Sequence, residues 1–202
     1  GFAFGGDADR LAVVYDGEVV DGDTVLYNIS KSITLKDNVV VGTVLNNLAL
    51  ERKLKQDGKK LLRTPVGDKH ICDLMYRNGY NLGGEQSGHY IVYPAATTGD
   101  GILSAIFLTK ALFRDGRLHD IEKLNLVPQK AIAEYAEPSI MYDKWIRSLL
   151  EESQQKLDGN GRIIMRMSGT EPKVRVMVES EDMSLVDAIL AEFKKYINSV
   201  AN

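Results

Sequence analysis

The chain has 202 residues, 44% of them hydrophobic and 26% charged, which suits a globular protein of one large or two small domains. The formal net charge of −3 provides no basic surface for nucleic acid or anionic lipid, and no apolar run is long enough for a membrane span or signal peptide, so we expect a cytoplasmic protein. The single cysteine, Cys72, excludes an internal disulfide and a cysteine-rich metal site, and its apolar helical surroundings predict a core position.

The first twenty residues predict short strands. Apolar runs at 2–4, 11–15 and 18–20 are separated by polar residues, and Asp16-Gly17 is a typical hairpin turn. Because the chain begins with Gly1 rather than Met, in what reads as a buried strand, we expect it to be a fragment of a longer protein.

Two carboxylates stand between the first two of these strands. The acidic loop, residues 5–10, reads Gly-Gly-Asp-Ala-Asp-Arg. Asp7 and Asp9 can converge on one hard cation through oxygen ligands, and the small neighbouring residues let the loop fold tightly around it. The alternative is a solvated turn in which Arg10 pairs with the carboxylates.

Residues 22–123 are predicted to form a parallel α/β domain. Asp21 or Asp23 can cap a first helix that carries one apolar face. Further helices are predicted at 48–56, 66–77 and 102–113, and strands at 39–44, 60–64 and 90–93. Strands that alternate with helices at this spacing indicate a parallel sheet, and the unbroken apolar run at 39–44 indicates a strand buried on both faces.

A run of polar residues bracketed by glycines precedes the last of these strands. The glycine-bracketed loop, residues 83–89, reads Gly-Gly-Glu-Gln-Ser-Gly-His. Glu85 accepts hydrogen bonds, Gln86 and Ser87 both donate and accept, and His89 can do either. This mixture suits a polyhydroxylated ligand such as a sugar, and a polar hairpin turn is the alternative.

Residues 124–202 are predicted to form a small α+β domain, with a few antiparallel strands and two helices on one face. The strands are expected at 129–135, 162–167 and 174–178, and the helices at 139–157 and 183–200. Trp145, Leu149 and Leu150 are expected on the core face of the first helix.

The loop between the last two strands is rich in hydrogen-bond donors. The phosphate loop, residues 166–172, reads Arg-Met-Ser-Gly-Thr-Glu-Pro, and Arg175 follows it. Arginine grips phosphate with two parallel hydrogen bonds, while hydroxyls and freed backbone amides reach the remaining oxygens. The alternative is a hairpin whose arginines pair with Glu171 and Glu179.

Taken together, these loops resemble the phosphohexomutase superfamily, and within it the bacterial phosphoglucosamine mutases. Four stretches carry the resemblance in the family's order: the acidic loop as the metal loop, Thr64-Pro65-Val66-Gly67-Asp68-Lys69 as a loop that opens a helix, the glycine-bracketed loop as the sugar-binding loop, and the phosphate loop with Arg175. The Gly-Glu-Gln-Ser-Gly-His form of the sugar-binding loop and residues 97–101 fit the phosphoglucosamine branch.

The resemblance implies that the chain holds part of a four-domain protein. Residues 1–21 would be the end of the second domain, 22–123 the α/β sugar-binding domain and 124–202 the α+β phosphate-binding domain. The sequence departs from the family in two places. The first aspartate of the metal loop is Gly5 here, which leaves two carboxylates, and no serine lies in the Ser-His-Asn loop that carries the family's phosphoserine.

The resemblance also implies a reaction and a role for each site residue. A mutase of this type interconverts glucosamine 6-phosphate and glucosamine 1-phosphate through a phosphoserine enzyme and a bisphosphate intermediate, in the synthesis of UDP-N-acetylglucosamine for the cell wall. Mg²⁺ would be held by Asp7 and Asp9. The implied catalytic residues are Arg10, Lys69 and His70. The implied substrate-binding residues are Glu85, Ser87, His89, Arg166, Ser168, Gly169, Thr170 and Arg175.

Two other functions stay open at this stage. A non-catalytic sugar-phosphate-binding fragment is favoured by Gly5 and by the missing phosphoserine loop, and a phosphoglucomutase or phosphomannomutase shares the same scaffold, although Gln86 argues against it. The expected partners are a sugar phosphate and the missing N-terminal domains. No nucleic acid or membrane partner is expected, and a homodimer is left open.

Overall fold

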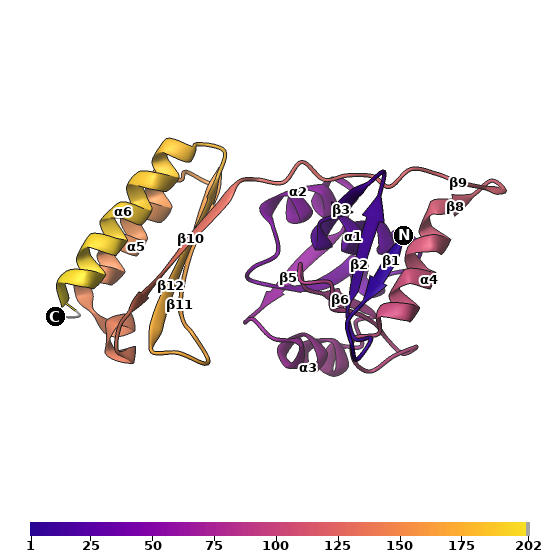
Figure 1. The fold of residues 1–202 in the computed structure, drawn as a ribbon, viewed down its shortest axis with the longest axis horizontal. Helices are drawn as coiled ribbons and strands as arrows, with labels where there is room; N and C mark the ends of the chain where they lie inside the picture. The colour runs from indigo at the N-terminus through magenta and orange to yellow at the C-terminus, as the bar shows by residue number, and fades with distance from the viewer. Residues whose placement is uncertain (201–202) are drawn as a thin grey trace. The chain divides into compact units, whose positions relative to one another are not determined.

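The computed structural model describes residues 1–200, and the chain divides into two compact units between Leu126 and Val127 (Figure 1). Unit 1 is Gly1–Leu126 and unit 2 begins at Val127. Residues 1–21, expected to end a separate domain, are part of unit 1. In the region that the structure describes, no helix is long and apolar enough to cross a membrane.

A three-stranded antiparallel sheet opens unit 1. It is formed by β1 (Phe2–Phe4), β2 (Leu11–Tyr15) and β3 (Glu18–Val20) in that order, as the apolar runs predict. The β2–β3 turn places Asp16 and Gly17 at φ 52° and 78°. Positive φ at both central residues is what a tight hairpin of the predicted kind requires.

A four-stranded sheet forms the centre of unit 1, in the order β5-β4-β6-β7. Its strands are β4 (Val39–Thr43), β5 (Lys60–Thr64), β6 (Leu82–Gly84) and β7 (Tyr90–Val92). β4 pairs in parallel with β5 and β6, and all five of its residues are buried, as predicted. The predicted parallel sheet is wrong for β7, which runs antiparallel to β6, because the five residues between them are too few for a crossover.

Four helices of unit 1 lie close to the predicted ranges. They are α1 (Gly22–Ile29), α2 (Leu48–Gln56), α3 (Asp68–Asn78) and α4 (Gly101–Leu112), with a short 3₁₀ turn η1 (Lys36–Asn38). The side chains of Asp21, Asn47 and Asp100 each accept a hydrogen bond from the first turn of α1, α2 and α4. A hairpin of β8 (Phe113–Arg114) and β9 (Arg117–Leu118) follows α4 and was not predicted. Cys72 is partly buried and packs against the core around Val41 and Ile71.

Unit 2 is an antiparallel sheet with both long helices on one face (Figure 1). The strands β10 (Gln129–Tyr135), β11 (Gly161–Met167) and β12 (Lys173–Ser180) lie in the order β10-β12-β11. The helices are α5 (Lys144–Lys156) and α6 (Met183–Val200). Val174, Val176 and Val178 of β12 are fully buried in the core that includes both helices. Because side chains alternate across a strand, Lys173 and Arg175 lie on the face without helices.

The predicted helix at 139–157 is interrupted. A 3₁₀ turn η2 (Pro138–Tyr142) precedes α5, and Asp143 between them accepts a hydrogen bond from Ile146 N at 3.0 Å and so starts a new helix. Trp145, predicted in the core, is 63% exposed and stacks on Tyr196 with 6.1 Å between ring centroids. Leu149 is buried as predicted.

Candidate functional site

Three loops of unit 1 meet around one hollow. Because β5, β4 and β6 are parallel neighbours, their carboxyl ends lie at one edge of the sheet, where ligands bind in folds of this kind. The loops after β5 and β6 and the acidic loop enclose a volume of about 340 Å³. Its lining residues are Asp9, Arg10, Val66, Gly67, Asp68, Glu85, Ser87 and His89.

Backbone hydrogen bonds fix the glycine-bracketed loop against β2. Leu11 N donates to Gly88 O at 2.9 Å, and Arg10 and His89 form an isolated antiparallel bridge. Glu85 N donates to His89 O at 3.0 Å and closes the turn. The polar side chains of the loop therefore stand at a fixed position beside the acidic loop.

Glu85 bridges two of the three loops. Its Oε1 accepts a hydrogen bond from Gly67 N at 3.2 Å, and this contact ties the start of α3 to the glycine-bracketed loop. Ser87 is exposed at the hollow. A carboxylate with one oxygen held and a neighbouring exposed hydroxyl can accept from and donate to the hydroxyls of a sugar.

His89 is buried and uses both ring nitrogens inside the protein. Its exposure is 7%. Nε2 accepts a hydrogen bond from Gly99 N at 3.1 Å, and Nδ1 lies 3.2 Å from Asp9 Oδ2. Asp68 Oδ2 is more distant, 3.8 Å from Nε2. The ring therefore connects the glycine-bracketed loop, the acidic loop and the turn before α4.

Asp7 and Asp9 of the acidic loop face one point. A Cβ at Gly5 would lie 3.2 Å from Asp7 Oδ1 and 3.5 Å from Asp9 Oδ1, so the side chains at these three positions converge. Asp9 Oδ1 is buried and, within residues 1–200, finds no hydrogen-bond partner, although Arg10 Nε lies 3.5 Å from it. Oxygen donors of this kind suit Mg²⁺, but no group of three ligating side chains occurs among the described residues.

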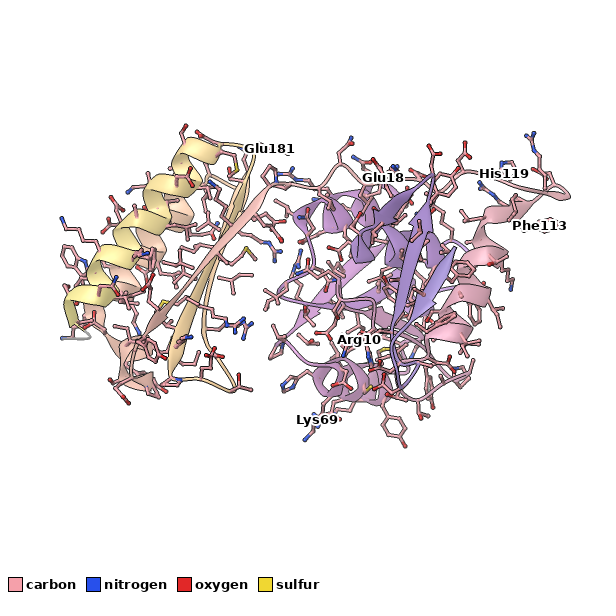
Figure 2. The ribbon with its side chains drawn as sticks, viewed as in Figure 1. Arg10, Glu18, Lys69, Phe113, His119 and Glu181 are labelled. Carbon is pink, nitrogen blue, oxygen red and sulfur yellow. The ribbon has the colours of Figure 1, made fainter. Side chains whose placement is uncertain are left out.

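The remaining unit 1 candidates differ in position. Arg10 lines the hollow with an exposed side chain, and Asp68, which sequence reasoning did not single out, lines it too. Lys69 and His70 are exposed on the first turn of α3 and are not among the lining residues. Figure 2 shows Lys69 extending outward from that end of α3. The signal for Asp68 was its place at the start of a helix, directly after the Thr-Pro-Val-Gly turn.

The phosphate loop of unit 2 places two arginines side by side. Arg166 and Arg175 are direct partners in the β11–β12 ladder. Partial burial lowers the pKa of Arg166, and the positive charge of Arg175 lowers it further. Two crowded guanidinium groups favour an anion between them, because the anion relieves their repulsion and accepts their hydrogen bonds.

Glu171 and Glu179 bind other residues more closely than they bind Arg166 and Arg175, in contrast to the alternative in which these glutamates pair with the two arginines. Arg175 Nη2 lies 3.9 Å from Glu171 Oε2, whereas Lys173 Nζ binds Glu171 Oε1 at 2.8 Å. Glu179 is fully buried and accepts from Arg162 and from Gln129. Ser168 is partly buried, and Gly169 and Thr170 are exposed at the tip of the loop.

Family models match nearly the whole chain. Residues 21–126 match the model described as phosphoglucomutase/phosphomannomutase, alpha/beta/alpha domain III, and residues 114–195 match the C-terminal domain of the same family.

Curated relatives are longer than this chain. A phosphoglucosamine mutase of Streptococcus gordonii is 44% identical over 93% of the chain, and one of Bacillus pumilus is 40% identical over 93%. In both cases the match covers 44% of the relative, so the chain spans less than half of their length. A crystal structure of Aspergillus fumigatus N-acetylphosphoglucosamine mutase in complex with GlcNAc-6P and magnesium matches with a TM-score of 0.75 at 20% identity, over 100% of this chain and 49% of that one. At that identity the likeness shows the fold.

Proposed function

Because the chain belongs to the phosphoglucomutase/phosphomannomutase family, we propose that it is the C-terminal half of a phosphoglucosamine mutase. The whole protein would interconvert glucosamine 6-phosphate and glucosamine 1-phosphate in the cytoplasm, through a phosphoserine and a bisphosphate intermediate. Its product would serve the synthesis of UDP-N-acetylglucosamine and peptidoglycan. The mutase names of the relatives that are 40–44% identical support this choice within the family.

The observation that carries the proposal is the meeting of three loops around the hollow in unit 1. Glu85, held through Oε1 by Gly67 N, would accept from a sugar hydroxyl with its second oxygen. Ser87 would donate to or accept from a neighbouring hydroxyl. The hollow of about 340 Å³ has the size of a small polar ligand, and its lining is mostly polar or charged.

The phosphate loop would bind the phosphate that is not being transferred. Arg166 and Arg175, paired across β11 and β12, would contact it with their guanidinium groups. Ser168, Gly169 and Thr170 would complete the contacts with hydroxyl and backbone donors. Both guanidinium groups stay charged at neutral pH, so the loop would bind a phosphate group whichever carbon of the sugar carries it.

Asp7 and Asp9 are the residues that would hold a divalent cation. Their oxygens converge, and the buried Asp9 Oδ1 has no hydrogen-bond partner among the described residues, so the donor set fits Mg²⁺ with several coordination positions left to water. When bound there, the cation would neutralise charge on the phosphoryl group in transfer. Arg10 would add a positive charge at the same side of the hollow.

The phosphoryl donor would come from the N-terminal half of the protein. None of the serines in these 202 residues stands in a Ser-His-Asn loop. The chain would therefore bind substrate and position it, and the missing domains would carry the reactive serine.

Calorimetry on the 202-residue chain tests the proposal. We expect glucosamine 6-phosphate to bind more tightly than glucose 6-phosphate and mannose 6-phosphate. Preference for either of the latter would favour a phosphoglucomutase or phosphomannomutase, and equal binding of all three and of inorganic phosphate would reduce the site to a non-selective phosphate binder.

A further inference from the structure

His89 lies between two elements that meet only in the folded chain. Its ring nitrogens contact Gly99, ten residues away, and Asp9, eighty residues away. The ring is almost fully buried, so these contacts replace contacts with water. The side chain is therefore a strut between the turn before α4 and the acidic loop.

The contact with Gly99 determines which nitrogen carries the proton. A backbone N–H can only donate, so Nε2 must accept and must lack a hydrogen. In the neutral ring the hydrogen then resides on Nδ1, where it faces Asp9 Oδ2 at 3.2 Å. The same ring cannot offer a proton from Nε2 while Gly99 donates to it.

The turn before α4 is shaped around this ring. A Cβ at position 99 would lie 2.4 Å from both Cε1 and Nε2 of His89, closer than any real side chain allows. Two residues on, Gly101 N donates to Ala8 O at 2.8 Å. One short turn thus sets the position of the ring and of the acidic-loop backbone together.

Because His89 binds Oδ2 of Asp9, the other carboxylate oxygen, Oδ1, is directed at the position proposed for the cation. Oδ2 is taken by the ring, while the buried Oδ1, which lies 3.5 Å from Arg10 Nε, and Asp7 Oδ1 both face the point at which a side chain of residue 5 would stand. A carboxylate that ligates a metal is commonly oriented by a hydrogen bond to its other oxygen.

We propose that His89 is a positioning residue for the cation: Gly99 fixes its tautomer, and its Nδ1–H holds Asp9 so that Oδ1 faces the metal. The inference rests on the proposed cation site. Removal of such a supporting hydrogen bond lowers metal affinity by roughly 10–100-fold.

Two conservative substitutions separate the two contacts. His89→Asn places an amide nitrogen near the position of Nδ1, so it keeps a donor for Asp9 and loses the acceptor for Gly99. His89→Gln places its amide near Nε2, so it keeps an acceptor for Gly99 and loses the donor for Asp9. His119→Gln, directly after the β8–β9 hairpin, removes a histidine remote from the acidic loop and serves as the control.

Binding of Mn²⁺, followed by water-proton relaxation on the 202-residue chain, gives the affinity of each variant. We expect His89→Gln to lose roughly 10–100-fold and His89→Asn and His119→Gln to stay within a few-fold of the unsubstituted chain. Equal losses in the two His89 variants, or no loss in either, would overturn the positioning role.

The tautomer provides a readout that needs no metal. Long-range ¹⁵N–¹H correlation spectra of the unsubstituted chain should show a protonated Nδ1 and an unprotonated Nε2. A protonated Nε2 would overturn the inference even if a variant fails to fold. Failure of the proposed function is recognised separately, by the sugar-phosphate calorimetry described above.

Discussion

Restoring a carboxylate at position 5 should convert the acidic loop into a stronger cation site. The backbone of Gly5 is outside the left-handed region, so aspartate can adopt its φ without backbone strain, and the Asp7 carboxylate need shift only by a few tenths of an ångström to make room for the Cβ. Its Cβ would point at Asp7 Oδ1 and Asp9 Oδ1 from 3.2 and 3.5 Å. In Gly5→Asp three carboxylates would converge, and their repulsion should lower the melting temperature when no divalent cation is present.

The magnitude follows from linkage between binding and folding. Mg²⁺ at 100 times its dissociation constant stabilises the native state by about 2.7 kcal/mol, whereas at 1–10 times the constant it contributes about 0.4–1.4 kcal/mol. If the third carboxylate lowers the Mg²⁺ dissociation constant roughly ten- to hundredfold, one Mg²⁺ concentration is about 1–10 times the constant of the unsubstituted chain and about 100 times the constant of Gly5→Asp. For a chain of this length, about 2.7 kcal/mol corresponds to a rise in melting temperature of roughly 5–10 °C.

Thermal unfolding with and without Mg²⁺ measures the effect, and Gly6→Asp is the matched control. A Cβ at Gly6 would meet nothing within 4 Å, so this variant adds the same charge one residue away without directing it at Asp7 and Asp9. We expect a Mg²⁺-dependent rise in Gly5→Asp that Gly6→Asp does not share. An equal response of both variants would refute the convergent geometry.

Three further predictions concern the reaction, the phosphate loop and the core. Incubated with glucosamine 6-phosphate, Mg²⁺ and a hexose bisphosphate, the chain alone should form no 1-phosphate above background, and steady turnover would contradict the need for a separate phosphoserine. Arg175→Ala should weaken sugar-phosphate binding by about 1.5–3 kcal/mol in calorimetry and Lys173→Ala by much less, because Lys173 is engaged by Glu171; equal losses would rule out a specific clamp. Burial raises the pKa of Asp23 from 3.8 to about 6. Between about pH 4 and 6 the Asp23 carboxyl therefore keeps its proton in the folded chain, whereas in the unfolded chain it loses the proton. The free energy of unfolding should fall by up to about 3 kcal/mol as pH rises through this range. The free energy of unfolding, measured with urea between about pH 4 and 6, should fall less in Asp23→Asn than in the unsubstituted chain. The same pH dependence in both proteins would contradict this assignment to Asp23.

Local signals in the sequence were sufficient for most elements of the fold. Asp21 caps the first helix, as one of the two residues predicted to do so, and the unbroken apolar run of β4 is buried on both faces. The strand β6 escaped prediction because Gly83 and Gly84 have little intrinsic preference for a strand. Its extended form is imposed by pairing with β4 and β7.

Trp145 shows how a shift of one position changes which side chain faces the core. Ile146, the next residue, is buried on the same face of α5 as Leu149 and Ser153, because these residues are three and four positions apart. Trp145 lies about 100° around the helix from Ile146, and its ring packs on Tyr196 at the surface.

The sequence alone identified most of the candidate site residues, but it did not predict which of them contact one another. Asp9 and His89 were each singled out, but eighty residues separate them in the chain, and no periodicity relates positions so far apart. Gly99 was not predicted as a functional residue, because it has no side chain to suggest a role and acts by leaving space for the ring of His89. These relations depend on tertiary packing, which a single sequence records only indirectly.

Because β2 packs into the core of unit 1, removal of the first 21 residues by truncation or limited proteolysis should disturb that core. The family model starts at residue 21, yet Leu11 and Val13 are buried in the same core as Leu26 and Leu108. A gene product that starts at Gly22 would uncover that core and leave the carbonyl of Gly88 without its donor, Leu11 N. Cleavage near residue 21 should therefore yield an aggregation-prone piece, whereas a cut between Leu126 and Val127 follows the natural division between the two units.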